Sequence, residues 1–393
     1  MESPLQSSSG ARSVLKTAAL LGAGILVSLG ILEVFLRVAN PFGERIRGDK
    51  ILLPVHLRRV IQNTNFQRVD KRIVVSTNSL GFRGAEPPAD FASCLTLLAV
   101  GGSTTESIYI SDGKTWVDLL GKRLTDHFDS LWINNAGLDG HSSFGHRLLL
   151  EQRILRLKPR VALFLMGIND VGRDDLKTAD ASVLAGGGST GIFGRLVAAS
   201  AEHSAIVSSA LNLLRYRAAR QLKRIHNELQ IRWAKVLTPD PERAKLMLAD
   251  HKKRYLPGYS SRVEGLVDRC RQGGIEPVLI TQPALYGNGV DPTTKVFLAT
   301  LEVDPERGLY GSLAWTLLES YNDVLRDVGR QKGVLVVDLA REMPKDSRYY
   351  YDFIHFNNEG SAKVALLVSE ALCPLLEARF PTHLKAPCAA PIE

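Results

Sequence analysis

Short apolar runs alternate along this chain with stretches in which apolar residues recur at helical spacing. The runs are 95–100 (LTLLAV), 132–135, 161–166 (VALFLM), 277–281 (PVLIT) and 334–338 (VLVVD). Continuous apolar runs of this length are typical of parallel strands buried on both faces. Three- and four-residue steps predict helices over 115–128, 144–157, 259–271, 313–330 and 359–376. The alternation predicts an α/β fold with a doubly wound, mostly parallel five-stranded sheet.

The N-terminal segment has a different pattern. Residues 17–32 (TAALLGAGILVSLGIL) carry no charge, and 34–36 extend the apolar run towards the roughly 20 residues that span a membrane. A cleaved signal peptide would need small residues at −1 and −3, and cleavage after Ala39 would put Arg37 at −3. A buried core helix is weakened by three glycines. An uncleaved transmembrane helix over 14–36 fits best.

The remaining pattern divides the chain into regions. We expect a short tail over 1–13, a connecting region with short strands over 37–93, a main domain over 94–380, and a C-terminal tail over 381–393. Residues 175–255 interrupt the domain as a helical insertion, which begins with a Gly-rich stretch and becomes basic with an apolar stripe. That amphipathic pattern fits a helix packed on the sheet, and equally a lid or a membrane-contacting arm.

The charge pattern and the cysteines limit the classes of binding partner that we expect for this chain. The net charge is +8, but the basic residues are spread along the chain and are densest over 215–235. A solvated helical face explains this better than a membrane-surface patch or a nucleic-acid site. The four cysteines form no CxxC pair, so we expect no metal, and their spacing leaves any disulfide pairing open.

Basic residues flank the apolar segment on both sides, so charge counting does not orient it. Long domains translocate largely regardless of charge. We therefore expect a single-pass membrane protein whose main domain lies outside the cytoplasm, on the periplasmic side of a bacterial membrane.

Four polar motifs follow predicted strands. They are 101–106 (GGSTTE), 135–140 (NAGLDG), 167–170 (GIND) and 352–355 (DFIH). Open α/β sheets bind ligands at the carboxyl ends of their strands, so these motifs should meet at one edge. Taken singly, each also fits an ordinary turn, a helix cap or a surface pair.

Together the motifs supply the groups that acyl transfer needs. A serine hydroxyl, here Ser103, is a weak nucleophile that requires a base, and His355 offers a neutral imidazole near pH 7. Asp352 would hold the ring in the correct tautomer. The backbone N–H groups of Ser103 and Gly140, with the Asn169 amide, would bind the developing oxyanion.

These blocks resemble those of the SGNH/GDSL hydrolase superfamily over roughly 95–375. The resemblance implies a flavodoxin-like sheet, Ser103 as nucleophile, Gly140 and Asn169 as oxyanion donors, and Asp352 and His355 as the other catalytic residues, with no cofactor. Gly102 stands where the family usually has an acidic residue. The Gly-Gly-Ser-Thr block and the lead-in 77–84 (TNSLGFRG) resemble a membrane-anchored bacterial branch, as do Glu33 and Arg37 in the apolar segment.

By this resemblance, the expected activity is hydrolysis of carboxylic esters through an acyl-enzyme, with acetylated carbohydrate as one substrate class. An O-acetyltransferase would use the same intermediate, and a non-catalytic carbohydrate-binding protein would keep the fold without the reaction. A metal held by Asp352, His355 and Glu359 is a weaker hypothesis, because no further ligands are apparent in the sequence.

Overall fold

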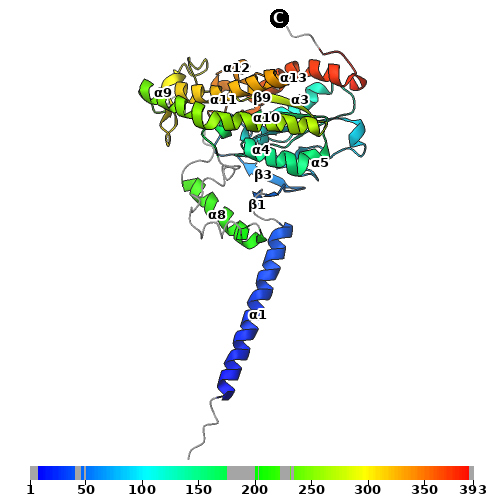
Figure 1. Cartoon of the computed structure of the whole chain (residues 1–393), viewed down its shortest axis with the longest axis vertical. Coiled ribbons are helices and arrows are strands. Elements are labelled where there is room, and N and C mark those ends of the chain that lie inside the picture. The colour runs from blue at the N-terminus through cyan, green and yellow to red at the C-terminus, as the bar shows by residue number, and fades with distance from the viewer. Residues whose placement is uncertain are drawn as a thin grey trace, which may run out of the picture. The chain divides into compact units, whose positions relative to one another are not determined.

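The computed structural model describes residues 8–39, 46–47, 50–174, 200–201, 203–221, 231 and 234–388 (Figure 1). The chain forms two compact units. The smaller comprises 1–54 and 187–214, and the larger comprises 55–186 and 215–393. Most of the connecting region expected over 37–93 therefore belongs to the larger unit.

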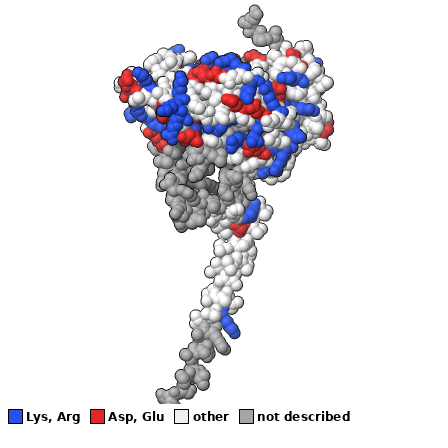
Figure 2. Space-filling view, viewed as in Figure 1, with Lys and Arg blue, Asp and Glu red and all other residues white. Residues whose placement is uncertain are grey.

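The smaller unit contains the long helix α1 (Ser8–Ala39). Its segment Ser13–Ala39 is long and apolar enough to cross a membrane, a test that a signal sequence near the N-terminus also meets. Its described side chains are almost all exposed, and Figure 2 shows them uncharged except near the two ends of the helix. A helix that is apolar all round and uncovered by protein is typical of a membrane span.

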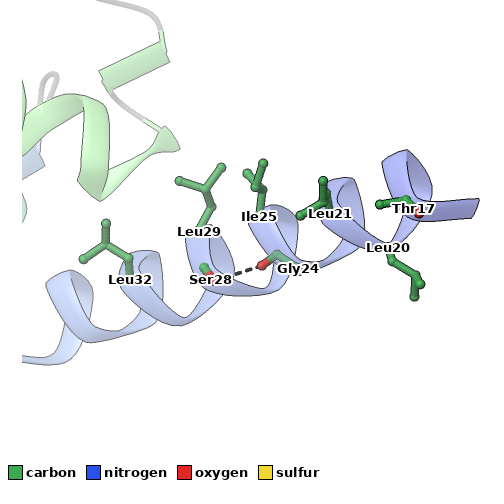
Figure 3. Close-up of a pocket in the computed structure, with 8 residues that line it drawn as sticks. All are labelled: Thr17, Leu20, Leu21, Gly24, Ile25, Ser28, Leu29 and Leu32. Carbon is green, nitrogen blue, oxygen red and sulfur yellow. Dashed lines mark hydrogen bonds between the residues drawn. The ribbon is translucent and has the colours of Figure 1, made fainter. Parts of the chain in front are cut away.

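One face of α1 carries a groove (Figure 3). It is lined by Thr17, Leu20, Leu21, Gly24, Ile25, Ser28, Leu29 and Leu32. The Ser28 hydroxyl donates to the carbonyl of Gly24 at 2.8 Å. The hydroxyl is thus paired within the helix, which lowers the cost of placing it in an apolar environment.

Near its C-terminal end, α1 binds the start of helix α8 (Ala205–Gln221). The Glu33 carboxylate accepts the backbone N–H groups of Ala205 at 2.7 Å and Ile206 at 3.1 Å. It also forms an ion pair with Arg37 at 2.7 Å. A carboxylate at this position satisfies N–H groups that have no partner within the helix. The unit also contains a short antiparallel pair, β1 (Ile46–Arg47) and β2 (Lys50–Ile51).

The predicted insertion over 175–255 is described only in part. Residues 175–199, 202, 222–230 and 232–233 lie outside the described residues, as do most of the basic side chains of 215–235. Beyond α8, the insertion contains α9 (Pro241–Asp250) and a π-helical turn, η6 (His251–Tyr255). Proline at the start of α9 and the Asp240 side chain, which caps it, explain where that helix begins.

The larger unit is built on a six-stranded sheet rather than the predicted five strands. Its spatial order is β12 (Val336–Val337), β9 (Glu276–Thr281), β8 (Val161–Met166), β6 (Leu95–Gly101), β7 (Leu131–Asn135) and β5 (Arg83–Gly84). The first five are parallel, and β5 pairs antiparallel with β7 at the edge. Short strands were expected in the connecting region, but a two-residue strand has no periodic pattern, which is why β5 was not counted in the predicted sheet.

The order of the parallel strands is that of a flavodoxin-like sheet, whose winding reverses between β6 and β8. Every side chain of β6 and β8 is buried, so both faces of the sheet are covered. Besides α9 and η6, the described α- and π-helices that lie wholly in this unit are α2 (Ser103–Glu106), α3 (Trp116–Leu124), α4 (Ser143–Leu149), η2 (Leu150–Ile154), α5 (Leu155–Leu157), α10 (Leu256–Gln272), α11 (Gly311–Lys332), α12 (Leu339–Glu342) and α13 (Asn358–Arg379). Helix α3 packs against α13, and α10 packs against α4 and α11.

Two further hairpins complete the unit. Strands β3 (Arg58–Gln62) and β4 (Arg72–Ser76) pair antiparallel, as do β10 (Glu302–Asp304) and β11 (Leu309–Tyr310). The β3–β4 hairpin supplies Phe66, Val69, Ile73 and Val75 to a buried cluster that also contains Ile110 and Tyr351. Residues before the first long strand of the sheet therefore pack close to the DFIH motif.

The C-terminal segment is bonded to the domain. Cys373 in α13 forms a disulfide with Cys388, with their Cα atoms 6.0 Å apart. Leu384 pairs with Phe128 through an isolated β-bridge. The other two cysteines, Cys94 and Cys270, are buried free thiols. The pairing that sequence spacing left open is thus assigned.

Candidate active site

Ser103 lies directly after β6, at the first position of the short helix α2. The two glycines before it let the chain leave the sheet in a confined space. A Cβ atom on Gly102 would lie 2.5 Å from the Asn169 amide nitrogen and 3.2 Å from the carbonyl oxygen of His141. Glycine at this position therefore brings the backbone before Ser103 against the two neighbouring loops.

The structure brings Ser103, His355 and Asp352 into one chain of hydrogen bonds. His355 Nε2 lies 2.7 Å from Ser103 Oγ, and His355 Nδ1 lies 2.6 Å from Asp352 Oδ2. With the shared proton on Nδ1, the ring donates to the carboxylate and Nε2 accepts from the serine hydroxyl. The His355 and Asp352 side chains are 13% and 16% exposed, so the arrangement lies close to solvent.

A tight turn holds Asp352 against the ring. Its Oδ1 accepts the backbone N–H groups of Ile354 at 2.8 Å and His355 at 2.7 Å. Aspartate side chains commonly fold back in this way onto the backbone two and three residues ahead. One oxygen therefore fixes the carboxylate to its own loop, and the other is left for the imidazole.

Aromatic rings support the imidazole from the side. The Tyr351 ring is stacked on that of His355, with centroids 5.4 Å apart and an interplanar angle of 8°. Phe66 contacts Tyr351 with centroids 4.7 Å apart, and Tyr109 with centroids 4.8 Å apart. The motif analysis did not select these three rings. A ring contributed by the β3–β4 hairpin carries no local signal that would connect it to a histidine almost 300 positions later.

The expected oxyanion donors lie on two loops beside Ser103. Asn169 follows β8, and its Nδ2 donates to the His141 carbonyl at 3.0 Å. Gly140 precedes that histidine and has a φ of +74°, which favours glycine. The Glu106 carboxylate fixes the same loop by accepting the N–H of Asp139 at 2.6 Å. Asn169 and the 140–141 turn thus converge next to position 102.

Arg83 braces the segment after the serine. This buried side chain donates to the carbonyls of Glu106 at 2.6 Å, Ser107 at 2.8 Å and Ile110 at 2.8 Å, and it pairs with Asp112 at 2.9 Å. It belongs to the TNSLGFRG segment, which resemblance had singled out without a role for the arginine. A guanidinium presents several donors in a fixed plane, and here they collect the carbonyls that end α2.

Potential metal ligands gather elsewhere. Among the described residues, the group of His, Cys, Asp or Glu whose ligand atoms converge is His127, Cys373 and Cys388, and its two sulfurs form the disulfide. Asp352, His355 and Glu359 do not form such a group. The hydrogen bonds of Asp352 and His355 instead connect them to Ser103.

A flavodoxin-like sheet with a Ser–His–Asp chain at its carboxyl edge is the arrangement of an ester-acting hydrolase. The GDSL-like lipase/acylhydrolase family model matches residues 99–363, more than half of the 393-residue chain. The chain belongs to this family.

The individual proteins that match this chain have low sequence identity to it or match only a small part of it. The chain is 33% identical over 79 residues to esterase TesA of Pseudomonas aeruginosa, a match that covers 20% of this chain and 39% of that protein. A lipase/acylhydrolase structure from Enterococcus faecalis is 15% identical, with 75% of this chain and 100% of that chain covered and a TM-score of 0.40. The acetylxylan esterase Axe2 of Geobacillus stearothermophilus is 15% identical, with 69% and 90% covered and a TM-score of 0.39.

Proposed function

We propose that this protein is a serine esterase that hydrolyses carboxylic esters through an acyl-enzyme on Ser103. The observation that carries the proposal is the 2.7 Å contact between Ser103 Oγ and His355 Nε2, with Asp352 on the other nitrogen of the ring. Family membership supports ester chemistry, and the flavodoxin-like sheet accounts for the meeting of residues more than 200 positions apart.

In the proposed reaction, His355 Nε2 takes the hydroxyl proton as Ser103 Oγ attacks the ester carbonyl carbon. Asp352 stabilises the imidazolium that forms. The tetrahedral oxyanion accepts hydrogen bonds from the N–H groups of Ser103 and Gly140 and from the Asn169 amide. The bond to the leaving alcohol then breaks, and His355 returns the proton to that oxygen. A water molecule then attacks the acyl carbon as His355 takes one of its protons, the bond to Ser103 Oγ breaks, His355 returns the proton to that oxygen, and the carboxylic acid leaves.

The finer assignment follows from resemblance. We propose a short acyl group, with acetylated carbohydrate as the substrate class, and membership of the membrane-anchored branch that carries Gly-Gly-Ser-Thr. Transfer of the acetyl group to a carbohydrate hydroxyl is the alternative outcome, because water and a sugar attack the same acyl-enzyme. A non-catalytic carbohydrate-binding role is disfavoured by the complete set of reactive groups at the sheet edge.

The test uses the full-length protein in detergent. A fluorophosphonate probe should label wild type but not Ser103→Ala, and the exposed-serine variant Ser79→Ala should label normally. Ester hydrolysis across acyl chain lengths, followed with the same variants, should be fastest for acetyl. Acetate release from an acetylated polysaccharide, with and without a non-acetylated acceptor, separates hydrolysis from transfer. Labelling and turnover that persist in Ser103→Ala would overturn the proposal.

We also propose that α1 anchors the protein as a single span, with the larger unit on the periplasmic side. The exposed apolar length of α1 supports the span. The Cys373–Cys388 disulfide supports the orientation, because disulfides persist in oxidising compartments and are rare in the cytosol. Protease added outside intact cells with a permeabilised outer membrane should digest the larger unit. Protection until the inner membrane is opened would reverse the orientation.

A further inference from the structure

A buried carboxylate lies beside the proposed oxyanion amide. Asp170 directly follows Asn169 in the 3-10 turn η3 (Ile168–Asp170), and it is completely buried. Both of its oxygens accept the backbone N–H of Ser143 at 3.1 Å, and the Ser143 hydroxyl also donates to it. Ser143 begins α4, three residues after Gly140. The carboxylate therefore joins the loop that carries Asn169 to the loop that carries Gly140.

Arg262 completes this connection from α10. Its Nε donates to Ser143 Oγ at 2.7 Å, and its Nη2 lies 3.6 Å from Asp170 Oδ1. The arginine side chain is only 10% exposed, and its guanidinium lies 4.0 Å from the centre of the Phe144 ring. A carboxylate removed from water requires a countercharge and filled hydrogen-bonding positions. Arg262 supplies the charge, and the Ser143 hydroxyl relays its hydrogen bond.

A second link crosses the same two loops. The Asn169 amide itself donates to the His141 carbonyl at 3.0 Å. Residues 141 and 143 belong to one loop, and residues 169 and 170 belong to the other. The Asn169 amide and the Asp170 carboxylate therefore each connect the same two loops. A shift in either loop moves the amide together with the Asp170–Arg262 ion pair.

We propose that Arg262, acting through Ser143 and Asp170, is a positioning residue for the oxyanion hole. It holds the Asn169 amide and the Gly140 N–H at the separation that the tetrahedral intermediate requires, without contacting the substrate. The inference rests on the esterase function proposed above. Displacement of a reacting group by about 1 Å can lower turnover by about 100-fold. Loss of a residue that positions the oxyanion donors should therefore be measurable as a fall in kcat.

The test compares variants of two arginines on α10. Arg262→Met removes the connection, Arg262→Lys retains the charge without the planar fork of donors, and Ser143→Ala removes the relay. Arg269→Met is the matched control, because Arg269 makes a half-exposed ion pair with Glu151 at 3.1 Å on the same helix. For each variant, kcat is divided by the number of sites that a fluorophosphonate probe labels, so that unfolded protein is not counted.

We expect Arg262→Met and Ser143→Ala to lower kcat per labelled site by about 10- to 100-fold with KM changed less than about threefold. Arg262→Lys should be intermediate and Arg269→Met unchanged. In an Asn169→Ala background, Arg262→Met should lower kcat by a smaller factor than it does in wild type, because one of the two donors that it positions is already absent; groups in one network are non-additive in this way.

Results that would overturn this inference can be told apart from results that would overturn the esterase proposal. Wild-type protein that neither labels nor turns over would remove the esterase function itself. An active wild type combined with unchanged kcat per labelled site in both Arg262→Met and Ser143→Ala would show that the ion pair is only structural. Full additivity with Asn169→Ala would also overturn the inference.

Discussion

Asp352 and Asp170 both lie at the carboxyl edge of the sheet, but their surroundings differ. Asp352 lies close to solvent, and one of its oxygens contacts the ring of His355. Asp170 is inaccessible to solvent, and its partners are a serine and an arginine with a fixed charge. Asp352 is thus bonded to the imidazole that contacts Ser103, whereas Asp170 joins two loops at the sheet edge.

The comparison shows that location on the sheet edge does not identify a reactive carboxylate. Burial raises the pKa of Asp170, while the hydrogen bonds from Ser143 and the positive charge of Arg262 act in the other direction. Removing one partner of a buried pair of this kind is strongly destabilising, because the other charge stays buried without compensation. The partners of the two carboxylates, rather than their place at the sheet edge, distinguish the role proposed for Asp352 from the role proposed for Asp170.

The largest expected effect is on turnover in Asp352→Asn. The amide cannot stabilise the imidazolium and favours the wrong ring tautomer, so kcat should fall about 10⁴-fold, as in a well-studied serine protease. The melting temperature should change little, because the side chain is near solvent. Steady-state kinetics and thermal unfolding check both parts. A loss below tenfold would remove Asp352 from the proposed catalytic set.

The matched variant Asp170→Asn should show its main effect in stability. Removing the charge leaves the Arg262 guanidinium buried without its counterion, which costs about 3 kcal/mol or more in the free energy of unfolding. Denaturant titration of the detergent-solubilised protein measures this difference. Stability equal to that of wild type would mean that Asp170 and Arg262 do not form a buried ion pair in solution. The contrast between Asp170 and Asp352 would then no longer hold.

Asn169→Ala probes the side chain immediately before Asp170. Loss of one oxyanion donor typically lowers kcat by about 100- to 1,000-fold. KM should change much less, because the contact strengthens in the transition state. Separate measurement of kcat and KM decides the assignment. An unchanged kcat with a raised KM would make Asn169 a substrate-binding residue instead.

The smallest expected effect concerns His146, which is buried in α4 near Asp170's partner Ser143. Burial lowers its pKa to about 3, with His141 contributing in the same direction. Between about pH 3 and pH 6.5 the unfolded chain therefore binds a proton that the folded chain does not, so stability falls as the pH falls. The loss between pH 6.5 and 5 should be about 2 kcal/mol.

His146→Gln is neutral in both states and should remove this contribution from the pH dependence of unfolding. Equal slopes in the two proteins would show that His146 accepts a proton in the folded state.

Much of the fold could be predicted because its central strands are buried on both faces. The runs LTLLAV and VALFLM correspond to β6 and β8, all of whose side chains are buried. Once the strands were placed, the polar motifs after them indicated Ser103, Asn169 and the Asp352–His355 pair without any distance information. Those assignments depended on the order and direction of the strands, because the connection rules for parallel α/β sheets leave few possible topologies.

The features that sequence did not predict depend on which segments meet in the folded chain rather than on a local pattern. Neither Arg83 nor Arg262 occupies a periodic position, and their partners lie on segments distant in sequence. The Cys373–Cys388 pairing was open because four cysteines allow three connectivities. The strand β5 is too short to show an alternation. Each depends on three-dimensional proximity that local propensity does not encode.

The crowding at Gly102 has a consequence for how the family signature is interpreted. The space into which an aspartate Cβ would project already contains the amide of Asn169. An aspartate at position 102 would therefore require the Asn169 side chain, on the loop after the neighbouring strand β8, to move away from its present position. In this chain, glycine at position 102 and the placement of the Asn169 amide are thus sterically coupled.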